Sequence, residues 1–342
     1  MTAYIPGEQP QDKKYVKLNT NESPYSASDG VVKAINEQKI KDLRLYCDPE
    51  CKILKGELAR VYNTDAKKVF VSNGSDEILN FAFMAYGQKG VAFADITYGF
   101  YSVFCELYGL QAQIIPLKQD FSLDIDGFCN QNKLVVIANP NAPTGMDISL
   151  GDIEKILKSN PDSVVLIDEA YVDFGGNSCA CLTEKYKNLL CVQTFSKSRS
   201  MAGARLGFAI ADKEIISDLE KIKYSTNPYN VNSLTQTAGI NALIDNDYYM
   251  ANALKIIENR NYTVGELKKL GFTVLPSKAN FVFAKTDMIR GLDLYLKLKE
   301  KGVLVRHFTK ERIKDFNRIT IGSYEEMQFF IAKIKEILGE IK

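Results

Sequence analysis

The chain is short of histidine. Among 342 residues there is one, His307. A histidine-based zinc site and the metalloprotease motif that needs two histidines are therefore disfavoured. A Ser-His-Asp triad would have to use that single residue. The chemistry must consequently rest on lysine, tyrosine, aspartate and arginine, or on a cofactor.

Other absences narrow the class of protein. With 43 basic and 42 acidic side chains, no excess of one charge suggests binding to nucleic acid or anionic lipid. No apolar run approaches the roughly 20 residues of a membrane helix. Residues 1–7 lack the basic and apolar regions of a signal peptide. We therefore expect a cytoplasmic protein with neither a membrane nor a nucleic-acid partner.

The seven cysteines form no disulfide framework, because their number is odd and they are scattered. Cys179 and Cys181 are spaced C-x-C, and Cys47 and Cys51 are four apart, but neither pair has a matching second pair. We expect free thiols and no metal site. No G-x-G-x-x-G motif follows a predicted strand, which argues against a nicotinamide dehydrogenase.

Short apolar segments rich in β-branched residues alternate with helical patterns in the middle of the chain. Strands are predicted over 68–71, 90–94, 113–116, 134–138, 163–167, 189–193 and 207–211. Helices are predicted over 75–86 and 150–158. Buried strands separated by helices predict an α/β fold with a mostly parallel, seven-stranded sheet.

The pattern changes after residue 245. A long amphipathic helix is predicted over 246–270, strands over 272–275 and 281–284, and a closing helix over 324–341. We therefore predict a large domain over 41–245 and a smaller α+β domain over 246–342. Residues 1–40 are predicted to form an N-terminal arm that also contributes to the small domain.

Two side chains stand out at the ends of predicted strands, where open α/β sheets bind their ligands. Lys197 follows the strand 189–193 and stands between Ser196 and Arg205, so its amine is well placed to hold an aldehyde cofactor that carries a phosphate. Asp168 follows four apolar residues, and a carboxylate there needs a cationic or donor partner. A protonated pyridine nitrogen would serve.

Three weaker signals point to the same kind of ligand. Gly74, Ser75 and Asp76 stand at the start of a predicted helix, whose free N–H groups can bind a phosphate. An ordinary helix cap has the same sequence pattern. Tyr98 offers a flat ring for stacking on a heteroaromatic ligand, although a tyrosine more often packs in the hydrophobic core. Arg205 could clamp a phosphate or form a surface ion pair. We expect every candidate to lie at the carboxyl end of a strand.

Taken together, these motifs resemble a known family. The runs N-P-N-A-P-T-G at 139–145, D-E-A-Y at 168–171 and T-F-S-K at 194–197, with Arg205, resemble fold-type I pyridoxal-phosphate aminotransferases. The flanking runs narrow the resemblance to the histidinol-phosphate aminotransferase family. They are L-N-T-N-E-S-P-Y at 18–25, L-Y-C-D-P at 45–49, V-L-V-R at 303–306 and R-I-T-I-G at 318–322. The similarity extends from residue 4 to about residue 330.

The resemblance implies roles toward pyridoxal 5'-phosphate. Lys197 would be its Schiff-base anchor and would then move the proton between Cα and C4′. Asp168 would pair with the ring nitrogen, Tyr171 would hydrogen-bond the ring hydroxyl, and Tyr98 would stack on the ring. The phosphate would be held by Ser75, Asp76, Ser196 and Arg205.

The resemblance also implies how substrates bind. Arg306 and Arg318 would hold the acidic end of the substrate, and Arg318 would also bind the carboxylate of glutamate. Asn21 and Tyr25 belong to a motif that lies near the substrate in the family. Tyr46 would reach the cofactor phosphate of a neighbouring subunit, so the resemblance implies a homodimer.

One departure concerns the ring oxygen of the cofactor. Many relatives have asparagine directly before Pro-Thr-Gly, whereas this chain has Ala142. Either Asn141 replaces that asparagine or Tyr171 acts alone.

The expected reaction exchanges an amino group between histidinol phosphate and 2-oxoglutarate, the two partners of a glutamate-linked transaminase. Alternatives are an aromatic amino-acid transaminase or a threonine-phosphate decarboxylase of the same fold. A different class would be a non-catalytic module that keeps the fold.

Overall fold

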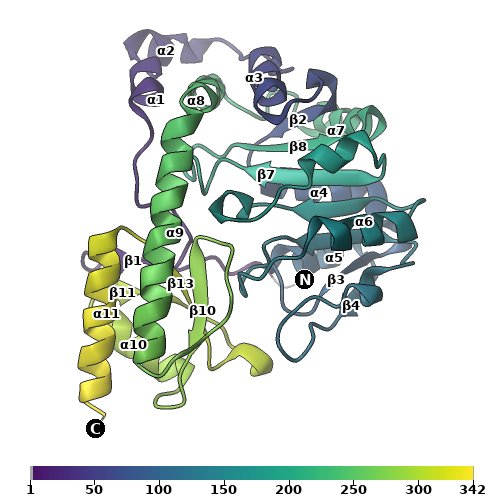
Figure 1. The fold of residues 1–342 in the computed structure, drawn as a ribbon. Coiled ribbons are helices and arrows are strands. Elements are labelled where there is room, and N and C mark those ends of the chain that lie inside the picture. Colours follow the sequence, from purple (N-terminus) through teal and green to yellow (C-terminus); the bar gives the residue numbers. More distant parts are fainter. Residues whose placement is uncertain (1–2, 342) are drawn as a thin grey trace.

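The computed structural model describes residues 3–341, and its centre is one seven-stranded sheet (Figure 1). The strand order is β2 (Val69–Ser72), β8 (Gly207–Ala211), β7 (Leu189–Thr194), β6 (Val165–Asp168), β5 (Leu134–Ala138), β3 (Val91–Ala94) and β4 (Ala112–Ile115). All neighbours are parallel except the two pairs that β8 makes. The predicted strands are confirmed to within two residues.

Helices cover both faces of this sheet, which explains why its strands are unbroken apolar runs. Along β5, Val135 and Ile137 enter one core cluster, and Leu134, Val136 and Ala138 enter the other. The first face carries α3 (Lys52–Tyr62), α6 (Leu150–Ser159) and α8 (Ser233–Ile244), and the second carries α4 (Ser75–Tyr86), α5 (Phe100–Tyr108) and α7 (Lys213–Thr226). The period-2 alternation of each strand thus builds two cores.

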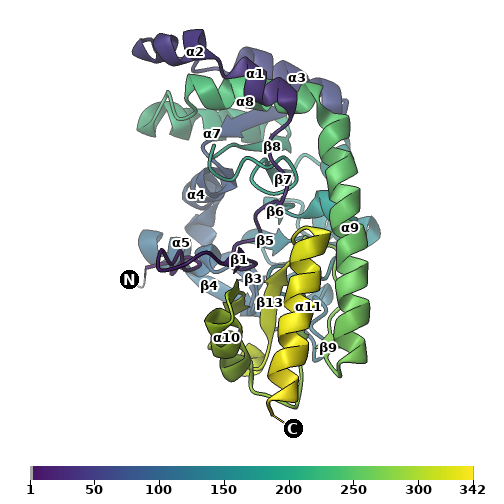
Figure 2. The ribbon, with the colours of Figure 1, turned by 90° about the vertical axis from the view of Figure 1, so that its left-hand side faces the viewer.

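The last hundred residues form a second, smaller layer. It contains α9 (Asn246–Lys269), β9 (Thr273–Val274), β10 (Phe281–Lys285), α10 (Gly291–Glu300), β11 (Val303–Leu304), β12 (Arg306–His307), β13 (Asn317–Thr320) and α11 (Tyr324–Gly339). Strands β12, β13, β10 and β9 make an antiparallel sheet in that order. Helices α9 and α11 run side by side beyond it in both views (Figures 1 and 2). Ser323 and Glu326 form a capping box that starts α11.

The N-terminal segment joins the two parts of the molecule. Strand β1 (Val16–Lys17) pairs in parallel with β11 of the smaller layer, and the two form a separate two-stranded sheet. The short helices α1 (Asp29–Ala34) and α2 (Glu37–Lys41) then pack on α8 of the large part. Figure 2 shows this purple segment running from beside α5, past β1, to α1. The predicted domain limits stay predictions, and residues 1, 2 and 342 lie outside the described residues.

Short 3-10 helices complete the secondary structure. They are η1 (Asp42–Arg44), η2 (Ala66–Lys68), η3 (Gly87–Lys89), η4 (Asp126–Phe128), η5 (Val172–Phe174), η6 (Ala180–Glu184) and η7 (Glu311–Ile313). Over residues 3–341, none of the helices has the length and apolar character needed to traverse a bilayer.

The register of the large sheet decides which residues meet at one edge. Ser72, the last residue of β2, and Thr194, the last of β7, both pair with Gly207, the first residue of β8. Because β8 is antiparallel, its amino end lies beside the carboxyl ends of its neighbours. Arg205 therefore reaches this edge by preceding a strand, which corrects the expectation that every candidate follows one.

Candidate active site

A cavity of about 940 Å³ opens at this edge of the sheet and extends to the small antiparallel sheet. Eleven of the residues singled out in the sequence line it: Asn21, Ser75, Asp76, Tyr98, Asp168, Tyr171, Ser196, Lys197, Arg205, Arg306 and Arg318. They come from the N-terminal segment, the carboxyl ends of β2, β3, β6 and β7, the amino end of β8 and the small sheet. The fold thus brings together groups that are up to about 300 residues apart in the chain.

Lys197 lies in the loop after β7, with its amine in the cavity. The Nζ atom donates a hydrogen bond to the carbonyl of Thr20 at 3.2 Å and lies 5.8 Å from the centre of the Tyr171 ring. Among residues 3–341 no carboxylate pairs with it within 4 Å, so the amine is not committed to an ion pair. A nucleophilic amine needs this freedom to bond an aldehyde.

Asp168, the last residue of β6, is a nearly buried carboxylate. Its Oδ2 accepts a hydrogen bond from Tyr101 at 2.8 Å, and its Oδ1 accepts one from the backbone N–H of Ala170 at 3.3 Å. No arginine or lysine of the described chain forms an ion pair with it. Burial raises the pKa of Asp168 to about 6, and the hydrogen bond from Tyr101 opposes this rise. A cationic ligand group would be stabilised here.

Tyr101 is a site residue that the sequence reasoning missed. It is fully buried on α5, three residues after Tyr98, and the two rings meet edge to face at 5.7 Å. The Y-x-x-Y spacing at 98–101 is the signal that could have found it, because residues three apart share one side of a helix. One helix start thus positions both a stacking ring and the donor to Asp168.

The variant Tyr101→Phe is expected to raise the pKa of Asp168 further, because it removes a hydrogen bond that stabilises the ionised carboxylate. Since the ionised form pairs with a cationic ligand, the acidic limb of the pH profile of kcat/KM should move to higher pH by about one unit. Tyr108→Phe is the matched control, because Tyr108 lies on the same helix and bonds Asn80 instead. An acidic limb identical in both variants would contradict this role.

The start of α4 and the loop before β8 together form an anion site. Gly74 precedes α4 and no side chain caps the first turn, so its N–H groups remain free. Gly74 has a φ of +77°, and an added Cβ would lie 2.6 Å from the Arg205 guanidinium. A Cβ on Gly207 would lie 2.4 Å from the nitrogen of Ser75. Only glycine permits this close packing around the anion site.

Asp76 and Ser196, two of the predicted phosphate ligands, already have hydrogen-bond or ion-pair partners within the protein. The Asp76 carboxylate pairs with Arg205 at 3.0 Å and accepts the hydroxyl of Tyr98 at 2.9 Å. It therefore orients the arginine and the tyrosine, and only its backbone N–H suits a phosphate. Ser196 is buried, and its hydroxyl accepts a hydrogen bond from Thr194 at 3.0 Å.

Tyr98 and Tyr171 contribute two aromatic rings to the cavity wall. Tyr98 is held by Asp76, as described, and by ring contacts with α5. The Tyr171 hydroxyl accepts a hydrogen bond from Asn21 Nδ2 at 2.9 Å, and its ring meets Phe281 edge to face at 5.0 Å. Asn21 is itself fixed by Thr320 of β13. The N-terminal motif thus orients the tyrosine of D-E-A-Y.

Arg306 and Arg318 are paired in register across β12 and β13. Neither has a carboxylate partner within 4 Å among the described residues. Arg318 donates to the carbonyl of Asn19 at 2.9 Å, and its Nε is buried with no hydrogen-bond partner. Burial lowers the pKa of Arg318, and the charge of Arg306 adds to this effect. Two guanidinium groups that lack counterions are suited to an anionic substrate.

Three predicted site residues do not line the cavity. The Asn141 amide is buried and bonded to Thr97, Ile96 and Thr144, so it holds loops together. Tyr25 packs with the small-domain core, under the amine of Lys255. Tyr46 is 84% exposed and stacks on Tyr229 at 4.4 Å. Within one chain, none of the three touches the cavity.

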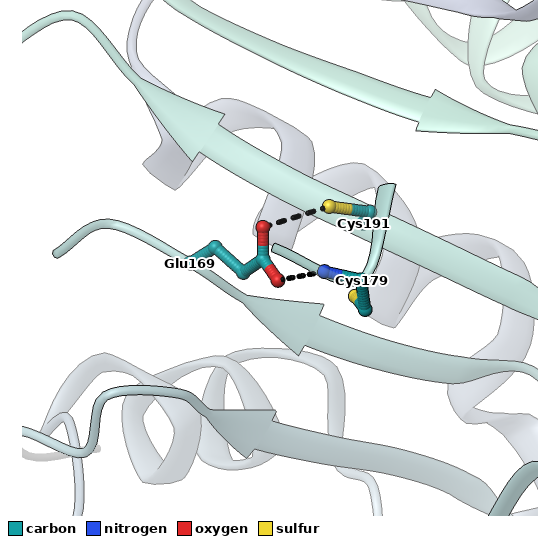
Figure 3. Close-up of side chains that lie close together, drawn as sticks. All are labelled: Glu169, Cys179 and Cys191. Atoms are coloured by element: carbon teal, nitrogen blue, oxygen red, sulfur yellow. Dashed lines mark hydrogen bonds between the residues drawn. The ribbon is translucent and has the colours of Figure 1, made fainter. Parts of the chain in front are cut away.

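Glu169, the neighbour of Asp168, is the centre of a buried hydrogen-bond network (Figure 3). Its carboxylate accepts from the Cys191 thiol at 3.2 Å and from the Cys179 backbone at 2.6 Å (Figure 3), and also from Ser178 at 2.6 Å and Gln193 at 2.8 Å. These four donors already occupy the lone pairs of the Glu169 carboxylate. Burial also raises the pKa of the Cys179 thiol well above its ordinary value, so this thiol stays protonated. The network therefore anchors the end of β6 that carries Asp168.

Comparison with known proteins now identifies the class. A model described as aminotransferase class I and II matches residues 13–334, and the chain belongs to this family. It is 52% identical to the histidinol-phosphate aminotransferase of Brachyspira hyodysenteriae, over 98% of this chain and 96% of the relative. It is 47% identical to the Clostridium botulinum (strain Langeland) enzyme of the same name, over 99% and 96%.

The fold is also similar to solved structures. The histidinol-phosphate aminotransferase of Sinorhizobium meliloti, determined in complex with pyridoxal-5'-phosphate, matches with a TM-score of 0.88. It is 23% identical and covers 96% of this chain and 92% of its own. The chain described here is thus an enzyme whose cofactor is pyridoxal phosphate and whose fold is of type I.

The residues present fit this cofactor. The buried Asp168, which lacks a cationic partner, suits a protonated ring nitrogen. The uncapped start of α4, with Arg205, suits a phosphate. Lys197 supplies the free amine, and Tyr98 supplies a flat ring.

Proposed function

We propose that this enzyme transfers an amino group between histidinol phosphate and 2-oxoglutarate, with imidazole-acetol phosphate and glutamate as the products, a step of histidine biosynthesis. The observation that carries the substrate assignment is the pair Arg306 and Arg318. They are directly opposite each other on β12 and β13, and they line the same cavity as Lys197. Neither has a counterion among the described residues. A phosphate in one half-reaction can engage both guanidinium groups, and the smaller carboxylate of glutamate in the other can be held by Arg318. The names of the relatives agree with this choice.

The side chains have separable tasks in this reaction. Bound pyridoxal phosphate supplies the electron sink that stabilises negative charge at the substrate Cα. The Lys197 amine removes the proton from the substrate Cα and delivers it to C4′ of the cofactor. Asp168 keeps the ring nitrogen protonated, because its carboxylate favours the cation. Arg306 and Arg318 fix the acidic end of the substrate, which places Cα within reach of the amine.

An assay of the purified enzyme tests the proposal. With pyridoxal phosphate, histidinol phosphate and 2-oxoglutarate, we expect glutamate to form with saturation kinetics. Absence of glutamate would contradict the proposal. Glutamate formed only from aromatic amino acids, or carbon dioxide released from threonine phosphate, would identify one of the two alternatives of the same fold. Failure of the protein to bind the cofactor would indicate a non-catalytic module.

We further propose that two copies form the functional unit and that the enzyme works in the cytoplasm. Exposed apolar side chains gather in one stretch of the chain, as expected for an interface. They are Val32, Ile35, Ile40, Leu43, Leu45, Tyr46 and Ile53. By resemblance, Tyr46 would reach the cofactor phosphate in the second copy. The seven free cysteines favour a reducing compartment.

The variant Tyr46→Phe is expected to weaken cofactor binding about tenfold, because one hydrogen bond to a charged phosphate is lost. A Lys197→Ala chain co-expressed with a Tyr46→Phe chain should then recover activity at limiting cofactor. In the mixed dimer, one site combines an intact Lys197 with an intact Tyr46 from the other copy. Activity no greater than that of the two separate variants would show that Tyr46 does not act across the interface.

A further inference from the structure

Lys197 lies in the loop between β7 and β8, which has neither helix nor strand around the lysine. Within the loop, the Met201 N–H donates to the carbonyl of Phe195 at 3.1 Å and closes a turn around Lys197. This bond does not reach the segment after β6, where Tyr171 lies. Beyond the pairing of the strands, the place of Lys197 relative to Tyr171 therefore depends on side chains beside the lysine.

One carboxylate, that of Asp173, binds both residues that follow Lys197. Asp173 lies in η5, two residues after Tyr171. Its Oδ2 accepts a hydrogen bond from the Ser198 hydroxyl and another from Nη1 of Arg199, the latter at 3.1 Å. A single carboxylate oxygen thus joins two consecutive residues of the lysine loop to the segment that carries Tyr171.

Arg199 is a buried cation, with only 3% of its side chain exposed. Its guanidinium lies 5.3 Å from the centre of the Phe195 ring, and its Nε is buried with no hydrogen-bond partner. Over residues 3–341, Asp173 is the one carboxylate within 4 Å of it. Two charges that leave water for a buried ion pair lose much of the energy that their attraction supplies. The pair therefore matters more for the geometry that it fixes than for net stability.

The second arm of Arg199 reaches the helix that leads into the small domain. Its Nη2 donates to Oδ1 of Asn246 at 3.0 Å, and Asn246 is the first residue of α9. Figure 1 shows α9 running from α8 to the small antiparallel sheet. Helix α9 also packs on η5. Arg199 thus ties together the lysine loop, η5 and the start of α9.

We propose that Asp173 is a positioning residue for Lys197: through Ser198 and Arg199 it fixes the loop so that the lysine amine keeps its place beside Tyr171. This inference rests on the role of Lys197 in the proposed function. Asp173, Ser198 and Arg199 are not among the cavity-lining residues, so they act through the lysine and not on the substrate. Proton transfer requires the amine within hydrogen-bond reach of the substrate Cα, and a displacement of about 1 Å can cost about 100-fold in rate.

The test begins with Ser198→Ala in the holoenzyme. This variant removes one hydrogen bond to Asp173 and keeps the ion pair with Arg199, so the protein should fold. In the half-reaction with glutamate, we expect the rate at saturation to fall about tenfold, with the glutamate concentration for half-saturation nearly unchanged. Ser200→Ala is the matched control, because it lies in the same loop and its hydroxyl bonds Ser23 instead. It should match the wild type.

Glutamate deuterated at Cα separates positioning from a loss of folded protein. A displaced amine slows removal of the Cα proton, so the isotope effect on the rate should be larger in Ser198→Ala than in the wild type. A slower reaction with an unchanged isotope effect would overturn the inference, since it would indicate a structural role. So would a rate equal to that of the wild type.

A spectroscopic measurement needs no turnover. The circular dichroism of the bound cofactor's absorbance band should weaken in Ser198→Ala and stay unchanged in Ser200→Ala, because a looser lysine holds the ring less rigidly. An unchanged band in Ser198→Ala would overturn the inference. Failure of the wild type to use glutamate would instead contradict the proposed function, and the dichroism would still decide the role of Asp173.

Asp173→Asn tests the carboxylate itself. It keeps the shape and removes the charge, so the rate with glutamate should fall about 100-fold. Because Ser198 acts through Asp173, Ser198→Ala should cost less in this background than alone. Fully additive losses would overturn the inference. If the unpaired Arg199 prevents Asp173→Asn from folding, the isotope effect and dichroism of Ser198→Ala decide.

Discussion

An enzyme with alanine at position 197 is expected to lose at least about four orders of magnitude in turnover, with its fold intact. In the proposed mechanism the Lys197 amine is both the covalent anchor and the base at the substrate Cα, so its loss would remove two functions at once. No other lysine among residues 3–341 is placed to replace it: Lys310, which also lines the cavity, has its Nζ bonded to the carbonyl of Asp95. Steady-state transamination and thermal unfolding should be measured on the same preparation.

Lys255→Ala is the matched control for this variant. Like Lys197, Lys255 makes one hydrogen bond, to Asn252 at 3.3 Å, and lies over a tyrosine ring, that of Tyr25 at 5.3 Å. Both substitutions should change the free energy of unfolding by about 1 kcal/mol or less. Only Lys197→Ala should abolish turnover. Wild-type-like activity in Lys197→Ala would refute the central assignment.

Substitutions of Arg306 and Arg318 are expected to affect the two half-reactions differently. Arg318→Ala should lower kcat/KM by about 100-fold or more for both histidinol phosphate and glutamate, because in the proposed binding mode Arg318 contacts the acidic end of either substrate. Arg306→Ala should cause a loss of similar size for histidinol phosphate only. The physical reason is position: Arg318 is partly buried and bonded to the carbonyl of Asn19, whereas Arg306 donates to the carbonyls of Ile5 and Pro6 in the N-terminal segment. Initial rates with each substrate varied in turn provide the measurement.

Arg290→Ala serves as the control for charge alone. Arg290 pairs with Asp293 at the start of α10 and does not line the cavity, so neither kcat/KM should change. Equal losses for both substrates in Arg306→Ala would mean that the phosphate is bound elsewhere. A loss confined to glutamate in Arg318→Ala would assign that arginine to one half-reaction only.

The strands of the large sheet were predictable because each is buried on both faces. Burial by helices on two sides selects unbroken apolar runs, and such runs are visible without any partner. Asp168 and Lys197 were visible for a related reason. Each is an ionisable side chain at or just after the end of such a run, where a buried charge needs a partner that the apolar run itself does not supply.

The direction of β8 and the place of Asn141 were not predictable in this way. An apolar run reads the same in either direction, so the antiparallel pairing of β8 with β2 and β7 leaves no local trace. The motif at 139–145 placed Asn141 one residue from the expected position, but its hydrogen bonds to Thr97, Ile96 and Thr144 depend on how two loops pack.

The sequence by itself determined the class of chemistry, the order of the strands along the chain and the residues available for the cofactor. These properties are local, since they depend on burial patterns and short motifs. Only the tertiary structure decided that Tyr101 donates to Asp168 and that Arg306 donates to the carbonyl of Pro6, which is 300 residues away in the chain. Such contacts depend on strand register and on packing between distant segments, which no periodicity within one segment encodes.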